Sequence, residues 1–544
     1  MASDPIEHVV LLLLENHSFD QMLGSLSETI PQLDGIDRSN LHINKDIDGR
    51  SYIQTPTVER QMLDDPHHEV LHVATQIADE NGGFVKDFSQ AFPDSTPAAR
   101  QFIMGYYPRG FLPALHTLAE AFTVCDRWHA SVPGPTWPNR FFALTGTSNG
   151  RVNMPEDGTH KSDPAGYMQQ TQDTIFDRLS EKAIHWKVYF HDIPQTTVLE
   201  HQRRPVNAAR YFYISEFFKD ARGDESEFPQ FSLIEPSYMG WGQNDDHPPF
   251  DVMRAEKLIA DVYNAIRSNE KLWKKTLLVV FYDEHGGFYD HVTPPAATPP
   301  DDHHEEYSFD RLGVRVPAIL VSPWVERRVE HTLFEHTSVL KYLIEKWTLG
   351  PLGRRTAEAN GIGVALSRSS ARTDTPERIE LSAEQLRAPD PEAEEKAFGK
   401  RNDHQEALAA LASHLEREVT DAAVVAVPVL SAWLARLLAS AAAAFRSMAE
   451  RRAGAPPGIQ VSIAAPDRLS HHNDVAPKDD FARYLMLRKR LAIPQLAQQV
   501  RKADPASAEH QHAIRTLGLV TGRQYHNEAA GSEHAQAWLA RHGQ

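Results

Sequence analysis

The chain has 544 residues, enough for one large domain and a smaller one with a sizeable core. Its composition is that of an ordinary globular protein, with 41% hydrophobic and 24% charged residues. The formal net charge of −18 argues against binding nucleic acid or anionic lipid through bulk charge. Any phosphate site must therefore draw its positive potential from a metal ion, a helix N-terminus or a few cationic side chains. The only cysteine, Cys125, excludes an intrachain disulfide.

The N-terminal region carries a short apolar run over residues 6–14 that ends at Glu15 and Asn16. Such a run is typical of a buried central strand in a parallel sheet, with polar groups delivered at its carboxyl end. No basic segment precedes it and no small-residue cleavage site follows it, so we predict a strand rather than a signal peptide. The expected location is the cytoplasm by default, or outside the cell by a signal-independent route such as type VI secretion. A short helix over 21–26 is expected next.

Residues 34–100 are polar and are predicted to be rich in loops. A helix is predicted over 112–122, because its leucines and other apolar residues recur on one helical face. A short strand over 122–128 follows.

The stretch SVPGPTWPNRFFALTGTS at 131–148 opens with a rigid Pro-Gly-Pro bend and runs into an apolar segment. Proline is tolerated in the first turn of a helix, so Thr136 is predicted to be the N-cap, with residues 141–144 as the buried body. A hydroxyl at the positive end of a helix dipole is well placed to meet phosphate. For an arbitrary threonine before a helix, capping alone is the commoner role.

Helices and apolar strands alternate through the rest of the first 365 residues. Strands are predicted over 185–190, 276–282 and 314–322, and helices over 174–183, 253–268 and 336–347. Residues 192–250 are predicted to form a long irregular insertion. This alternation predicts an α/β fold with a doubly wound, mostly parallel sheet.

The composition changes after residue 365. We predict a catalytic domain over 1–365, a charged linker or arm over 366–405, and a mainly helical C-terminal region over 406–544. Residues 422–445 are the most apolar stretch of that region and carry Pro428. They are too interrupted to predict a membrane span, and a helix packed on its neighbours is favoured over one lying on a membrane surface.

Three polar groups fall where strands of one sheet should end: Glu15 with Asn16, Thr136, and Asp283 with Glu284. Carboxylate and amide oxygens are hard ligands for a divalent cation, and a strand-to-helix hydroxyl is a nucleophile that needs activation. Each group alone has an ordinary structural explanation, such as capping a helix or closing a turn. Together they predict a metal-assisted reaction at one edge of the sheet.

Seven motifs in this chain carry a resemblance to a known family. They are ENHSFD (15–20), DPHH (65–68), GPTWPNR (134–140), DDHPP (245–249), YDEHGGFYDHVTPP (282–295), DRLGVRVP (310–317) and HTSVL (336–340). In this order they resemble the bacterial phosphoesterase family that contains the large phospholipases C and a secreted acid phosphatase, within the alkaline phosphatase superfamily. The TWPN string is also similar to the nucleophile turn of nucleotide pyrophosphatases. The resemblance implies a sheet of alkaline phosphatase type.

The resemblance also implies roles for residues at matching positions. Thr136 would be the nucleophile, and its oxygen would join Glu15, Asn16, Asp283 and Glu284 in holding a divalent metal ion, which could be Zn, Ca, Mn or Mg. The residues implied to contact the phosphoryl group or its leaving oxygen are His68, His247 and His336. Those implied to bind substrate are Asn139, His129 and His285, while His291 is expected to be structural.

The activity implied is that of a metal-dependent phosphodiester hydrolase of the phospholipase C type. It would release a phosphorylated head group from a phospholipid through a phosphothreonine intermediate, with peripheral membrane contact and no nucleic acid partner. The first alternative is an acid phosphatase (phosphomonoesterase) on the same fold. The threonine favours the diesterase, because the family's acid phosphatase uses serine. The second is a non-catalytic lipid- or phosphate-binding relative, against which the complete ligand set argues.

The region after residue 365 departs from the family, whose phospholipases often carry β-rich C-terminal domains. One hypothesis is that the tail, from about residue 400, covers or flanks the active-site face and tunes access to aggregated lipid. The alternative is that it packs on the domain or forms an oligomer interface.

Overall fold

An eight-stranded sheet runs through the computed structural model, which describes residues 4–155, 167–239, 243–304, 306–387, 401–426 and Ser507. In spatial order the strands are β13 (Arg328–Glu330), β6 (Thr123–Cys125), β12 (Ala318–Val321), β11 (Thr276–Tyr282), β1 (His8–Leu14), β10 (Phe231–Glu235), β8 (Trp186–Phe190) and β9 (Tyr211–Tyr213). The five strands from β11 to β9 are parallel, and β12 is antiparallel to both of its neighbours. The predicted mostly parallel sheet is confirmed.

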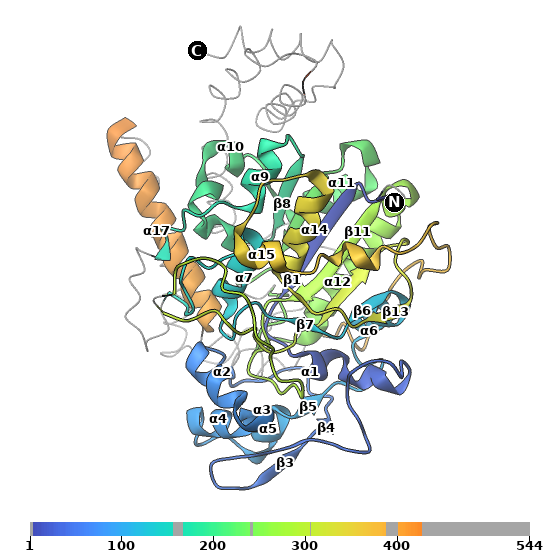
Figure 1. The fold of residues 1–544 in the computed structure, drawn as a ribbon, viewed down its shortest axis with the longest axis vertical. Coiled ribbons are helices and arrows are strands. Elements are labelled where there is room, and N and C mark those ends of the chain that lie inside the picture. The colour runs from blue at the N-terminus through green and yellow to red at the C-terminus, as the bar shows by residue number, and fades with distance from the viewer. Residues whose placement is uncertain are drawn as a thin grey trace, which may run out of the picture.

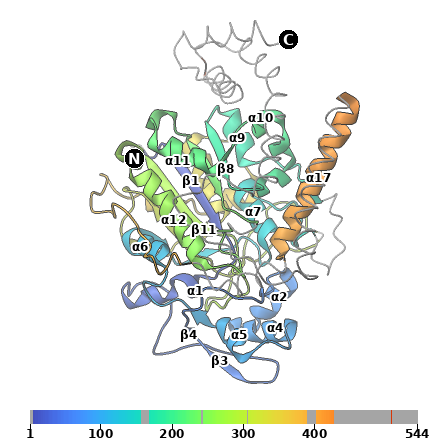
Figure 2. The same ribbon diagram turned by 180° about the vertical axis from the view of Figure 1, so that it is seen from behind.

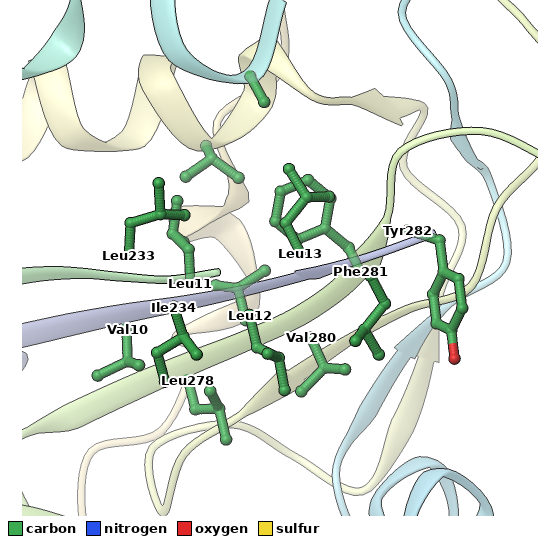
Figure 3. Packing of buried hydrophobic residues seen from close by; sticks show 14 of the residues in the cluster. Val10, Leu11, Leu12, Leu13, Leu233, Ile234, Leu278, Val280, Phe281 and Tyr282 are labelled. Carbon is green, nitrogen blue, oxygen red and sulfur yellow. The ribbon is translucent and has the colours of Figure 1, made fainter. Parts of the chain in front are cut away.

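The two central strands, β1 and β11, are buried along their whole length. Their leucine, valine and phenylalanine side chains pack with those of β10 above and below the sheet, as Figure 3 shows for Leu11, Leu13 and Val280. A strand covered on both faces has no need of polar alternation, which explains the continuous apolar runs in the sequence.

Helices cover both faces of this sheet. One face carries α7 (Thr136–Thr145), α14 (Thr337–Trp347) and α15 (Gly353–Glu358), and the other carries α6 (Pro113–Ala121), α11 (Ile214–Arg222) and α12 (Val252–Arg267) (Figures 1 and 2). Shorter helices complete the layers: α9 (Ile175–Glu181), α10 (Pro205–Ala208) and α13 (Glu270–Trp273). The fold is therefore doubly wound, as predicted.

A lobe formed by the first hundred residues after β1 lies beyond one end of the sheet (Figure 1). Its elements are α1 (Phe19–Leu23), β2 (Ile43–Lys45), β3 (Ser51–Ile53), β4 (Thr55–Pro56), α2 (Val70–Gln76), α3 (Ala78–Asn81), α4 (Phe84–Ala91), α5 (Pro97–Phe102) and β5 (Gly105–Tyr106). It has its own apolar cluster around Val73, Phe84 and Phe88. The prediction that 34–100 is rich in loops missed these elements, because they are too short to show a clear hydrophobic period.

Two further predictions need correction. The interval 192–250 is not an irregular insertion, since it contains β9, α11 and the central strand β10, whose five residues and internal Ser232 hide the strand pattern. Thr136 is the first residue of α7 and not its N-cap, which is Pro135. Whether Thr136 is the N-cap or the first helical residue, Pro138 falls in the first turn, where its missing N–H is harmless. The position of the proline therefore could not decide between these two helix starts.

The helix α17 (Asp403–Ala426) begins inside the predicted linker. Its apolar residues Ala407, Leu408, Leu411 and Leu415 join the same hydrophobic cluster as the sheet. The remaining small pair of strands, β7 (Trp128–His129) and β14 (Phe334–Glu335), lies between β6 and α14 in the chain. Of the predicted apolar stretch 422–445, only residues 422–426 are described. A search of the described helices finds none with the length and apolar character needed to cross a membrane.

Candidate active site

The register of β1 and β11 brings the two acidic pairs together. Leu14 lies opposite Tyr282, so Glu15 and Asp283 leave the sheet side by side at its carboxyl edge. The two ends are tied by the Asp283 amide, which donates to the Leu14 carbonyl at 3.1 Å, and by the Asn16 amide, which lies 3.4 Å from Asp283 Oδ1. In open α/β sheets this edge is where ligands bind.

The backbone directly after β1 is strained. Asn16 has a φ of 60°, in the left-handed region that few non-glycine residues adopt. Gly286 has a φ of 62°, and a Cβ at that position would lie 2.2 Å from the Asn16 carbonyl oxygen. The two loops therefore touch backbone to backbone, and such strain is typical of functional sites.

A buried arginine that sequence reasoning missed links the acidic pairs to α7. The Arg140 guanidinium lies 2.9 Å from Glu15 Oε1 and donates from Nε to Asp283 Oδ2 at 2.8 Å. Its Nη1 lies 2.8 Å from the Tyr238 hydroxyl. Arg140 is four residues after Thr136 in α7, so both side chains lie on one face of the helix. The sequence signal that could have identified it is that Arg140 is the one charged residue of α7.

Thr136 is completely buried, and its Oγ1 has no hydrogen-bond partner among the described residues. The bend before it is held by Asn139, whose Oδ1 accepts from the Val132 amide at 3.0 Å and whose Nδ2 donates to the Gly134 carbonyl at 2.8 Å. Asn139, predicted to bind substrate, thus spends its amide on the backbone that positions Thr136.

His68 and His247 present their Nε2 atoms to the site. Each ring directs Nδ1 to a backbone carbonyl, that of Pro66 at 2.9 Å and that of Pro248 at 2.6 Å. His68 Nε2 is then 3.9 Å from Glu284 Oε1, and His247 Nε2 is 2.6 Å from the Asn16 side-chain amide. A ring fixed through Nδ1 is the arrangement that orients histidines at metal and phosphoryl sites.

The carboxylates around these two rings raise the pKa values of the histidines. Burial by itself lowers the pKa of His247, but Asp65, Asp403 and Glu15 outweigh it and raise that pKa to about 10. The pKa of His68 is also raised well above its usual value, because Glu284 and Asp403 outweigh the effect of burial. In the opposite sense, burial raises the pKa of Glu284 to about 8.

The other three predicted histidines meet different partners, although His285 also reaches the cluster, with its Nδ1 3.5 Å from Glu284 Oε2. His336 accepts from the Trp128 indole at 3.2 Å and directs Nε2 to the Asp283 carbonyl at 2.6 Å. The His285 Nε2 lies 2.8 Å from Gln76 Oε1. The His129 Nδ1 lies 2.9 Å from the Gly313 carbonyl, and burial lowers the pKa of His129 to about 3.

The first turn of α17 also reaches the site, and neither of its polar residues there was predicted. Asp403 spans the two histidines, with Oδ2 3.4 Å from His68 Nε2 and Oδ1 3.4 Å from His247 Nε2. His404 Nδ1 lies 3.1 Å from Glu15 Oε1. No local signal marked these residues, because a charged stretch without periodicity is typical of a solvated linker.

Several buried oxygens at the site have no hydrogen-bond partner among the described residues. They are Glu15 Oε2, Asn16 Oδ1, Thr136 Oγ1 and Glu284 Oε1. Buried polar atoms are almost always paired, so a group of four in one place indicates a missing partner such as a cation. Asp283 differs from the other predicted ligands, since both of its oxygens already accept hydrogen bonds.

A different set of ligand atoms at the site also lies close together. Atoms of His68, His247 and Asp403 all lie within 4.8 Å of one another. His291, expected to be structural, belongs to another such group with Asp20 and Asp290, where its Nδ1 lies 2.8 Å from Asp20 Oδ2.

Comparisons with solved structures return only distant likenesses. The lipoteichoic acid synthase LtaP from Listeria monocytogenes aligns with a TM-score of 0.31 and 10% identity, over 65% of this chain and 75% of that one. A protein in the alkaline phosphatase superfamily from Vibrio parahaemolyticus aligns with a TM-score of 0.27 and 12% identity, over 46% of this chain and 65% of that one.

Comparisons of sequence are much stronger. Non-specific phospholipase C1 of Arabidopsis thaliana is 32% identical over 404 residues, covering 69% of this chain and 74% of the relative. Phospholipase C A of Mycobacterium tuberculosis is 29% identical over 415 residues, covering 66% and 75%. The model of the Phosphoesterase family matches residues 6–350, which include every predicted site residue. The chain belongs to the phosphoesterase family and is a phosphoric ester hydrolase related to the phospholipases C.

Proposed function

We propose that this protein is a metal-dependent phosphodiester hydrolase of the phospholipase C type, which acts on a phospholipid through a phosphothreonine at Thr136. The observation that carries the proposal is the group of unpartnered buried oxygens beside two oriented histidines at the carboxyl edge of the sheet. The lipid substrate is inferred from the names of the relatives, which are phospholipases C.

The residues present fit a hard divalent cation. Glu15, Asn16, Glu284 and Thr136 each offer an oxygen without a partner among the described residues, and Asp283 lies beside them. An all-oxygen donor set favours Ca²⁺, Mg²⁺ or Mn²⁺ over Zn²⁺. A cation bound there would lower the pKa of the Thr136 hydroxyl and offset negative charge on the phosphoryl oxygens.

In the first step the Thr136 hydroxyl gives up its proton to water, its Oγ1 attacks phosphorus, and the bond from phosphorus to the lipid alcohol oxygen breaks. His68, whose Nε2 faces the site while its Nδ1 is held by the Pro66 carbonyl, donates its Nε2 proton to that departing oxygen. His247 presents its Nε2 to the same position, where it contacts the phosphoryl oxygens. The products of this step are the free alcohol and a threonine that carries the phosphorylated head group.

In the second step His68, now neutral, takes a proton from a water molecule that attacks phosphorus. The bond from phosphorus to Thr136 Oγ1 breaks, Oγ1 regains a proton from water, and the phosphorylated head group is released. Arg140 does not touch the reacting atoms in this scheme. It is a positioning residue that holds Glu15 and Asp283 in register with the helix that carries Thr136.

The test is a comparison of wild type with Thr136→Ala and Thr136→Ser on choline-lipid, inositol-lipid and aryl phosphate substrates, each with added divalent metal and with chelator. We expect Thr136→Ala to lose activity by on the order of 10⁴-fold or more, as for other covalent nucleophiles. Acid quenching of the wild type followed by mass spectrometry should show the head-group adduct on the peptide containing Thr136.

Three outcomes would decide against the proposal. Turnover above a few per cent of wild type in Thr136→Ala would remove the nucleophile. Activity confined to aryl phosphate monoesters would identify a phosphomonoesterase. Binding of phosphate esters without turnover under every metal condition would identify a non-catalytic relative.

A further inference from the structure

The first turn of α17 occupies the mouth of the candidate active site. Glu15, Asn16, Thr136 and His247 have no exposed surface, whereas the Asp403 side chain is 21% exposed. The cluster therefore reaches solvent at Asp403, and α17 extends from there along the edge of the molecule (Figures 1 and 2). A phosphoryl group that bound both His68 Nε2 and His247 Nε2 would have to displace the Asp403 carboxylate from its place beside them.

The Asp403 carboxylate also competes with a phosphoryl group for the same two histidines. Its two carboxylate oxygens face the same two Nε2 atoms that the proposed mechanism uses for a phosphoryl group. A carboxylate and a phosphoryl group cannot both fill one position between the same two Nε2 atoms, because they would overlap and their negative charges would repel each other. Occupancy of the position by one excludes the other.

The turn is held mainly by polar contacts that displacement would break. Gln405 donates from Nε2 to the Tyr238 carbonyl at 2.9 Å and to Gln243 Oε1 at 2.7 Å. His404 packs its ring against Tyr238 with centroids 4.6 Å apart. The apolar anchor of α17 begins after this turn, at Ala407 and Leu408. The first turn can thus open at the cost of a few hydrogen bonds while the apolar anchor stays buried.

We propose that the first turn of α17 is an intramolecular cap, in which Asp403 occupies the phosphoryl position between His68 and His247 until substrate displaces it. The proposal rests on the proposed function, because it assigns the resting state of that same site. It explains why residues beyond the family match at 6–350 enter the site, and it makes the closed structure an autoinhibited form.

The first measurement uses wild-type protein and inorganic phosphate with added divalent metal. We expect phosphate to speed hydrogen–deuterium exchange of the amides in the first turn of α17, without unfolding the helix beyond Leu408. Slower or unchanged exchange on phosphate binding would overturn the cap. This readout needs no turnover, so displacement without hydrolysis would keep the cap and reject the hydrolase proposal.

The second measurement uses Asp403→Asn, which removes the charge but keeps the shape. If the open form is about a tenth of the wild-type population, the variant should lower KM for a soluble short-chain phosphodiester and the inhibition constant of phosphate by about tenfold. The matched control is Glu406→Gln, one turn along the same helix and paired with Arg401 at 3.2 Å instead of the histidines. It should leave both constants unchanged.

A fall in kcat for Asp403→Asn with unchanged KM and phosphate inhibition would overturn the proposal, because Asp403 would then be part of the working machinery. If Asp403→Asn fails to fold, the exchange measurement on wild type still decides the question.

Discussion

This molecule contains two largely buried clusters of charged side chains. They have similar compositions but differ in whether their polar atoms have hydrogen-bond partners. The active-site cluster comprises Arg140, Glu15, Asn16, Thr136, Asp283, Glu284, His68, His247 and Asp403. The Arg315 network comprises Arg315, Asp20, Asp34, Asp290 and His291. In the network, Arg315 pairs with Asp290 at 2.9 Å and Asp20 at 3.1 Å, and His291 bridges Asp20 and Asp34.

The two clusters differ in how many of their buried polar atoms have a hydrogen-bond partner. Each buried side-chain polar atom of the Arg315 network has a hydrogen-bond partner, whereas the active-site cluster keeps several oxygens without one among the described residues. Both contain a group of ligand atoms close enough for a metal ion, so proximity alone does not identify a site. We call a cluster closed when all its buried polar atoms have hydrogen-bond partners, and open when some do not. A closed network stabilises a fold, whereas the unpartnered atoms of an open one can bind a ligand.

The largest expected effect on stability is in the closed network. Asp20→Asn removes a buried carboxylate that pairs with both Arg315 and His291, and whose pKa is lowered because these cations outweigh the effect of burial, so it should lower the free energy of unfolding by about 3–5 kcal/mol. Urea denaturation measures the loss. Activity per folded molecule should stay near that of wild type, and an unchanged unfolding midpoint would show that the network is not structural.

The matching change in the open cluster is Glu284→Gln. We expect loss of bound divalent metal by elemental analysis and a fall in activity of about 100-fold or more. The unfolding free energy of metal-free protein should not fall, because the variant removes a carboxylate whose burial is unfavourable and raises its pKa to about 8. Full metal content with full activity would exclude Glu284 as a ligand.

The smallest effect, counted per pH unit, is the pH dependence of stability. The pKa of His291 is raised from 6.5 to about 10, since Asp20 and Asp34 outweigh the effect of burial. A raised pKa means that His291 stabilises the fold fully below pH 6.5 and progressively less as the pH rises to about 10. The stability gap between wild type and His291→Asn should therefore shrink by up to about 1.4 kcal/mol per pH unit in this range. A gap independent of pH would show that the ring is neutral.

The sequence predicted the central strands and their acidic ends well, because a continuous apolar run followed by paired polar residues has few other interpretations. It missed β10, whose five residues carry a weak pattern, and the lobe at 34–100, whose elements are short. It could not place Asp403 or His404, since their position depends on a tertiary contact across more than three hundred residues of chain. Nor could it separate Asn139 and His336, whose polar atoms are spent on the backbone, from the residues that face the site.

Because the backbones of Asn16 and Gly286 are in contact, the two acidic loops can change only together. Any side chain at residue 286 would collide with the Asn16 carbonyl, and Asn16 keeps its left-handed backbone only while that glycine makes room. Substitutions in one loop should therefore have effects that depend on the other, with strong non-additivity in double mutants. An attempt to graft either loop onto a different phosphoesterase would have to transfer both.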